Sequence, residues 1–165
     1  MKSNNVKKLV TAAVYVALGV ALGAVSFPVG ASKCAPFQHF INVVSGVTLG
    51  PWYSVLVAFV ISLLRNILGT GSLLAFPGSM VGALLAGLMF KYFKKDSLAV
   101  LGEFIGTSIL GALAAYPLAA FVMGKETALF AYVVPFAVSC AGGCILAYVL
   151  IKPLRKTGLM DKYMK

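Results

Sequence analysis

The stretch KKLVTAAVYVALGVALGAVSF, residues Lys7 to Phe27, decides the class of this protein. Two lysines precede an apolar run about as long as the ~20 residues that an α-helix needs to cross a bilayer. A secretory signal peptide also begins with lysines and an apolar core, but no A-x-A-like cleavage site follows this run, and further apolar runs come after it. We therefore expect an uncleaved transmembrane helix.

The composition extends this interpretation to the whole chain. The 165 residues are 61% hydrophobic and only 11% charged, and the mean hydropathy is +0.97. About a quarter of the residues are charged in a typical soluble domain. A soluble domain of this length has too little interior to hide so much apolar surface, whereas lipid accepts it on every outward face. We expect one membrane domain over residues 1–165.

Six apolar segments follow one another between charged residues and glycine or proline breaks. The second is short and polar at its start, so it is either a bent crossing or one completed by a buried loop. The sequence therefore predicts an all-α integral membrane protein with six transmembrane helices. The expected segments are Leu9–Phe27, Phe37–Leu49, Pro51–Leu68, Leu73–Phe90, Leu98–Met123 and Ala128–Ile151.

The positions of the cations predict the orientation of these helices. Six crossings put both termini on one side, where 11 lysines and arginines fall, and leave Lys33, Arg65 and Lys125 on the other. Because cytoplasmic loops carry an excess of lysine and arginine, we expect a plasma-membrane protein with both termini in the cytoplasm. The net charge of +10 thus reflects topology. Nucleic acid is not an expected partner, because no aromatic and basic binding face can be assembled.

The start of the second segment is unusually polar. The stretch SKCAPFQHFINVVSG contains Gln38, His39 and Asn42, and spacings of three and four residues place these side chains on one face of a helix. A lone histidine is more often a packing group, but beside two amides at an outer helix end we interpret it as part of a binding site. No metal site is expected, because there is no second histidine and the carboxylates lie elsewhere.

Arg65 is the clearest candidate for a buried functional charge. Counting from Pro51 at 1.5 Å per residue puts it about 21 Å into a hydrocarbon core of about 30 Å. Ser62 and Asn66 share its helix face in SLLRNILGTGS, which forms a polar strip. The alternative is that Arg65 extends to the outer interface or caps its helix end. The following GTGS lacks the spacing of a phosphate-binding loop, so ATP binding is not predicted.

Glu103 lies at a different expected depth. It is about 8 Å from the start of its helix, in the inner leaflet, so we expect no contact with Arg65 or His39. Every fourth residue from Glu103 to Ala115 is small or polar, which is typical of helix packing. A small intramembrane enzyme using His39, Arg65 and Glu103 is an alternative, but it needs the acid near the histidine.

The arrangement resembles the substrate-binding S component of an energy-coupling factor (ECF) vitamin transporter. Six helices in 165 residues, cytoplasmic termini and a ribbon of Ala13, Ala17 and Ala21 carry this resemblance. Within that class, FPVGASKCAPFQHFINVVSGVTLGPWY (Phe27–Tyr53) and RNILGTGSLLAFPGSMVGALLAG (Arg65–Gly87) are similar to the ThiW type, which is linked to the thiazole precursor of thiamine.

The resemblance implies a subunit of an ABC transporter without an ATPase or cofactor of its own. It would bind hydroxyethylthiazole at the outer face and dock through the alanine ribbon onto a membrane coupling protein, the T component, driven by two cytoplasmic ATPases. Another vitamin or small heterocycle is an alternative ligand, and a self-sufficient ion-coupled carrier is an alternative mechanism.

The resemblance also directs attention to the outer loops and outer helix halves, where pockets of this family lie. The substrate-binding residues expected there are Lys33, Gln38, His39, Asn42, Arg65, Asn66, Phe76, Ser79, Tyr116 and Tyr132. Hydroxyethylthiazole is neutral and needs no counter-ion. Lys33 and Arg65 would therefore form hydrogen bonds with it, hold loop carbonyls, or indicate an acidic ligand.

Overall fold

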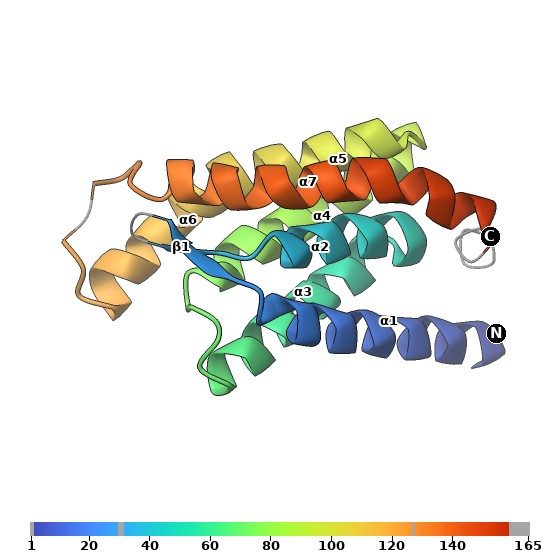
Figure 1. Cartoon of the computed structure of the whole chain (residues 1–165), viewed down its shortest axis with the longest axis horizontal. Coiled ribbons are helices and arrows are strands. Elements are labelled where there is room, and N and C mark those ends of the chain that lie inside the picture. Colours follow the sequence, from blue (N-terminus) through green and yellow to red (C-terminus); the bar gives the residue numbers. More distant parts are fainter. Residues whose placement is uncertain (1, 30–31, 127, 159–165) are drawn as a thin grey trace.

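The computed structural model describes residues 2–29, 32–126 and 128–158. Lys162 and Lys165, which contribute to the charge count, lie outside these residues. Helical segments run back and forth along the long axis, so that α1 begins and α7 ends at the same end of the bundle (Figure 1). In order, the elements are α1 (Lys2–Gly23), β1 (Phe27–Val29), β2 (Ser32–Cys34), α2 (Pro36–Leu49), α3 (Pro51–Ile67), α4 (Ala75–Phe93), α5 (Asp96–Ile105), η1 (Gly106–Gly111), α6 (Ala112–Pro117), η2 (Leu118–Val122) and α7 (Val133–Lys156).

Each of the six predicted segments contains a helix, although the first helix ends at Gly23 and not at Phe27, and the last begins at Val133 and not at Ala128. The elements α5, η1, α6 and η2 form one continuous helical segment, in which η1 and η2 are π-helical turns. Among the described residues, four helices are long and apolar enough to cross a membrane, whereas α2 and α3 are shorter, at 14 and 17 residues. The protein is therefore a helical membrane protein. The four long helices are Asn5–Gly23, Ala75–Phe93, Asp96–Val122 and Val133–Lys156.

A small β-hairpin, which no pattern in the sequence predicted, connects α1 to α2. Phe27 pairs with Cys34 and Pro28 with Lys33 in an antiparallel arrangement. Strands of three residues contain too little alternation to be recognised, and Pro28 has no N–H to continue a ladder. The hairpin carries Cys34 against α7, where its Sγ donates to the carbonyl of Pro135 at 3.4 Å.

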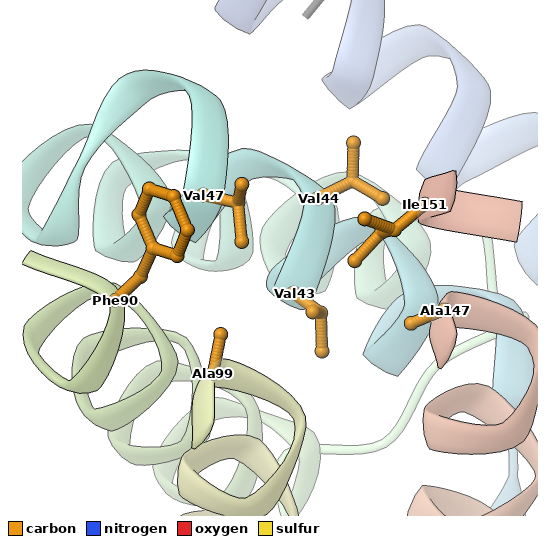
Figure 2. Packing of buried hydrophobic residues seen from close by; sticks show 7 residues of the cluster. All are labelled: Val43, Val44, Val47, Phe90, Ala99, Ala147 and Ile151. Atoms are coloured by element: carbon orange, nitrogen blue, oxygen red, sulfur yellow. The ribbon is translucent and has the colours of Figure 1, made fainter. Parts of the chain in front are cut away.

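Helix α2 forms the centre of the bundle. Its residues from Ile41 to Leu49 are all buried, so α2 has no face for lipid over that length. Figure 2 shows Val43, Val44 and Val47 of α2 among apolar side chains of α4, α5 and α7. This core fills the end of the bundle near the start of α1 and leaves the polar first turns of α2 at the other end.

Glycines bring the backbones of α4 and η1 into direct contact. A Cβ atom at Gly111 would lie 2.5 Å from the Cα of Gly78, and one at Gly106 would lie 2.8 Å from the Cα of Gly82. The Thr107 hydroxyl donates across this contact to the carbonyl of Gly78 at 3.2 Å. The small-residue stripe that begins at Glu103 is thus a packing face, as predicted, and it holds η1 close to the first turns of α4.

Candidate functional site

A polar pocket lies at the end of the bundle opposite the start of α1. About 450 Å³ of space is free of protein atoms there when the open mouth is included. Strand β2, the first turns of α2, α4 and α7, the end of α3, the loop after α3 and the turn η1 form its walls. The lining residues are Lys33, Ala35, Gln38, His39, Arg65, Gly71, Ser72, Ala75, Gly78, Ser79, Thr107, Phe136 and Ser139.

Gln38 connects three elements on one side of the pocket. Its Nε2 donates to Ser62 Oγ of α3 and to Ser79 Oγ of α4, both at 2.9 Å. Its Oε1 accepts a hydrogen bond from Nη1 of Arg65. Nη2 of Arg65 donates to the carbonyl of Thr70 at 3.2 Å. Arg65 is only 2% exposed, so it faces the polar interior and holds the loop beyond its helix instead of extending to the interface.

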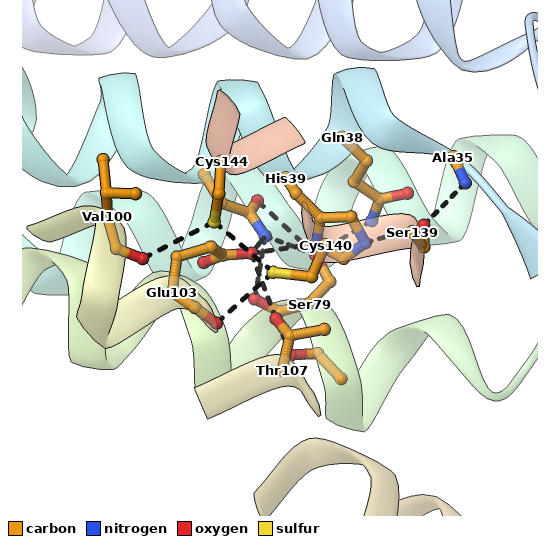
Figure 3. A network of polar contacts seen from close by, with 12 residues as sticks. Ala35, Gln38, His39, Ser79, Val100, Glu103, Thr107, Ser139, Cys140 and Cys144 are labelled. Atoms are coloured by element: carbon orange, nitrogen blue, oxygen red, sulfur yellow. Dashed lines mark hydrogen bonds and ion pairs between the residues drawn. The ribbon is translucent and has the colours of Figure 1, made fainter. Parts of the chain in front are cut away.

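His39 and Glu103 form a buried pair, so the expectation that depth separates them is wrong. His39 Nδ1 donates to Glu103 Oε1 at 2.9 Å, and Nε2 lies 3.1 Å from Ser139 Oγ, which accepts the N–H of Ala35 (Figure 3). Because α2 has only 14 residues, His39 is only about 15 Å from its end at Leu49. Glu103 is about 11 Å from the start of α5 at Asp96, and the side chains close the remaining distance.

Glu103 and Asn42 lie behind the pocket wall. Oε1 of Glu103 also accepts from Asn42 Nδ2 and from Thr107 Oγ1, each at 3.0 Å. Asn42 Nδ2 lies 3.2 Å from both the backbone and the hydroxyl oxygens of Ser79. Oε2 of Glu103 has no hydrogen-bond partner among the described atoms and faces Gly82, where a Cβ atom would lie 2.7 Å away. Together these groups orient lining side chains from α2, α4 and η1.

The family of this chain is established by comparison with known proteins. A family model described as thiamine-precursor transporter protein (ThiW) matches residues 9–157. The chain belongs to the ThiW family. This is a family of transporters and not of enzymes, so the His39–Glu103 pair lies in a membrane transporter. No curated protein and no solved structure matches the chain.

The same pair raises the question of a metal site in this ThiW family member. Ligand atoms of His39, Glu103 and Cys140 lie within 4.8 Å of one another, so the assumption that the carboxylates lie elsewhere is wrong. Cys140 Sγ also lies 3.7 Å from Cys144 Sγ. We assign no metal to this group, because His39 Nδ1 and Glu103 Oε1 are bonded to each other and Oε1 accepts two further hydrogen bonds.

The structure brings five of the ten expected substrate-binding residues into the pocket wall and places a sixth directly behind it. Asn42 is the one behind the wall. The residues in the wall are Lys33, Gln38, His39, Arg65 and Ser79.

The other four expected residues lie outside the pocket lining. Asn66 Nδ2 donates to the carbonyls of Ser62 at 2.7 Å and of Ser72 at 3.1 Å, which fastens the loop after α3. The ring of Phe76 packs against Phe59 of α3, with centroids 5.6 Å apart.

The two tyrosines also lie away from the pocket wall. Tyr132 is fully buried beside Phe136, and its hydroxyl has no partner among the described atoms. Tyr116 lies partly buried on α6, outside the lining. An aromatic residue at a helix end can pack against a neighbouring helix as readily as it can line a pocket. Its position along the helix does not show which of these arrangements it adopts.

Four polar or aromatic side chains of the lining, Ser72, Thr107, Phe136 and Ser139, were not selected from the sequence as site residues. Ser139 and Phe136 stand on α7, and Ser72 belongs to the loop after α3. A single serine within an apolar helix forms no repeating pattern, and no spacing rule separates Phe136 from ordinary core aromatics. Only Thr107 had attracted notice, as part of a packing stripe.

The alanine ribbon of α1 lies on the surface. Ala13, Ala17 and Ala21 are exposed and line an apolar groove between α1 and α3. Glycines on another face of α1 make the internal contact: a Cβ atom at Gly19 would lie 2.3 Å from Ile61 Cδ1, and one at Gly23 would lie 2.6 Å from Arg65 Nε. Packing within the monomer therefore leaves the alanines available.

Proposed function

We propose that this ThiW family member is the substrate-capturing S component of an ECF-type ABC transporter. It takes a thiazole precursor of thiamine, hydroxyethylthiazole, from the outer side of the plasma membrane. The polar pocket carries the proposal: Gln38, His39 and Arg65 meet at one end of an otherwise apolar bundle. Buried polar groups in a membrane domain are costly, and a ligand site is the usual reason for them.

In this proposal all six helical segments cross the bilayer and both termini are cytoplasmic. Helices α2 and α3 span about 21 and 26 Å, less than a hydrocarbon core of about 30 Å. The β-hairpin and the loop after α3 complete these crossings on the outer side, where irregular backbone is tolerated because it lines a polar cavity. The distribution of 11 cations on one side and three on the other supports this orientation.

The pocket offers complementary chemistry to a small heterocycle. Donors from Lys33, Arg65 and the lining hydroxyls suit the ring nitrogen and the side-chain oxygen of hydroxyethylthiazole. The ring of Phe136 provides an apolar surface for the flat thiazole. One aromatic wall and a few polar groups are typical of a small-molecule site.

Delivery to the cytoplasm would depend on partner proteins. The sequence contains no G-x-x-x-x-G-K-[ST] motif for ATP. The groove of Ala13, Ala17 and Ala21 offers a flat apolar surface to a membrane coupling protein that two cytoplasmic ATPases drive.

Ligand titration tests the substrate. Purified protein in detergent is titrated by isothermal calorimetry with hydroxyethylthiazole, thiamine, the pyrimidine precursor of thiamine and riboflavin. We expect heat of binding with the thiazole only. Binding of one of the others without the thiazole would exclude the proposed substrate and retain the S-component class.

A substitution in the groove tests docking. Ala17→Trp should fill the groove and stop uptake in cells that express the coupling module, while ligand binding by the purified protein is retained. Leu18→Trp is the matched control, because Leu18 is exposed on α1 outside the groove. Unchanged uptake in Ala17→Trp would remove the docking role from this face.

A further inference from the structure

The surface that a ligand meets in the pocket is positively charged. Among the described lining residues, Lys33 and Arg65 are cations and none is a carboxylate. Glu103 lies behind the wall, fully buried, and three donors already bind its Oε1. Of the other described acids, Asp96 pairs with Arg155, and Glu126 is exposed outside the lining. No acid on the wall therefore neutralises the two cations.

Arg65 is buried without a counter-ion among the described residues. Its guanidinium donates to two neutral acceptors, the side-chain oxygen of Gln38 and the carbonyl of Thr70, and its Nε has no described partner. A buried charge is costly unless it is paired, and neutral acceptors bind a guanidinium less strongly than a carboxylate or phosphate does. Burial of Arg65 becomes favourable if the ligand brings the missing negative charge.

The pocket also has distinct sides. Arg65 lies with the loop after α3, because the N–H groups of Thr70 and Gly71 both donate to its carbonyl. The hydroxyl oxygen of Ser72 in that loop accepts from the N–H of Leu74, which leaves its own O–H free to donate. His39, Phe136 and Ser139 form the opposite, aromatic side. An anionic group would lie beside Arg65, with a flat ring against Phe136.

We infer that the thiazole precursor accepted by this pocket carries an acidic group on its side chain, a phosphate ester or a carboxylate, held by Arg65 and Lys33. The inference rests on the proposed function, because it defines the charge of the ligand in the same pocket. Hydroxyethylthiazole is then the neutral and weaker-binding form of that ligand.

Three thiazoles that differ only in the side chain test the inference in the unmodified protein. Calorimetry compares hydroxyethylthiazole, its phosphate ester and the analogue with a carboxylate in place of the alcohol carbon. We expect at least one acid to bind about tenfold more tightly than the alcohol, as a charge-assisted bond replaces a neutral one. The acid that binds more tightly shows whether the pocket prefers a phosphate ester or a carboxylate. Alcohol binding as tight as both acids would overturn the inference and leave the proposed function standing, whereas no thiazole binding would overturn both.

Two variants show whether the named cations are responsible. Lys33→Gln changes an exposed side chain, so folding should be unaffected, and Arg65→Gln removes the buried charge. Each should weaken binding of the acid more than binding of the alcohol, so that the preference for the acid falls by about threefold in Lys33→Gln and about tenfold in Arg65→Gln. Lys125→Gln, an exposed cation outside the lining, is the matched control. If Arg65→Gln fails to fold, the binding of acid and alcohol by Lys33→Gln tests the inference on its own. Equal losses for acid and alcohol would contradict the inference.

Discussion

Replacement of Glu103 by glutamine would test whether one carboxylate holds together the wall of the pocket. Its Oε1 accepts three hydrogen bonds, from His39, Asn42 and Thr107, which stand on α2 and η1. Glutamine keeps an acceptor oxygen but removes the negative charge. It also puts an NH₂ group where Oε2 now faces Gly82 and has no described partner.

The expected loss follows from these three bonds. A hydrogen bond to a charged group contributes about 1.5–3 kcal/mol and a neutral one about 0.5–1.5, so each bond weakens by about 1 kcal/mol. The free energy of unfolding of Glu103→Gln should therefore fall by about 3 kcal/mol. Only the bonds from His39 and Asn42 join different helices, and interhelical hydrogen bonds in membranes average about 0.6 kcal/mol, which sets the lower limit at about 1 kcal/mol.

Equilibrium unfolding of the purified protein in mixed micelles, with increasing sodium dodecyl sulfate, measures this loss. Asp96→Asn is the matched control, since it makes the same chemical change in a pair with Arg155 whose side chains are 28% and 30% exposed. Such a pair contributes less than about 1 kcal/mol. If Glu103→Gln is no more destabilising than Asp96→Asn, the carboxylate does not organise the pocket wall and the reasoning fails.

Two further substitutions, one in a helix contact and one at a buried hydroxyl, are tested by the same unfolding measurement. Gly111→Ala should lower the free energy of unfolding by about 1–3 kcal/mol, because its Cβ would lie 2.5 Å from the Gly78 backbone. Gly142→Ala, with its nearest neighbour at 3.2 Å, should cost less, and equal costs would contradict a direct contact of backbones. Tyr132→Phe should leave stability equal or up to about 1 kcal/mol higher and ligand binding unchanged, because a buried hydroxyl without a described partner is removed. A lower unfolding midpoint for Tyr132→Phe would show that the hydroxyl is bonded in the folded protein.

Much of the fold could be predicted from the sequence, because charged residues, glycines and prolines separate the apolar runs that form the helices. Pro36 and Pro51 begin α2 and α3, as expected where a proline occupies the first helical turn. Helical spacing also predicted that Gln38 and His39 share a face with Asn42; the first two line the pocket, and Asn42 lies directly behind its wall.

The errors have different physical origins. Glu103 was placed in the inner leaflet by counting from the start of its helix, and His39 was placed at the outer end of its own helix, but α2 has only 14 residues and its first turn lies within reach of Glu103. Glu103 was therefore separated from His39, although the two side chains are bonded. Ser139 was missed because one serine in an apolar helix makes no pattern, and β1 and β2 because three residues show hardly one alternation.

The burial of α2 also bears on how the chain enters the bilayer during synthesis. A helix of 14 residues that carries Gln38, His39 and Asn42 has little affinity for lipid on its own, and in the finished bundle only other helices surround it from Ile41 onward. A single residue, Gly50, separates it from α3. The two helices are therefore suited to insert together as a hairpin, with the more apolar α3 supplying the affinity for lipid. Lengthening the connection at Gly50 would then impair membrane integration before it impairs ligand binding.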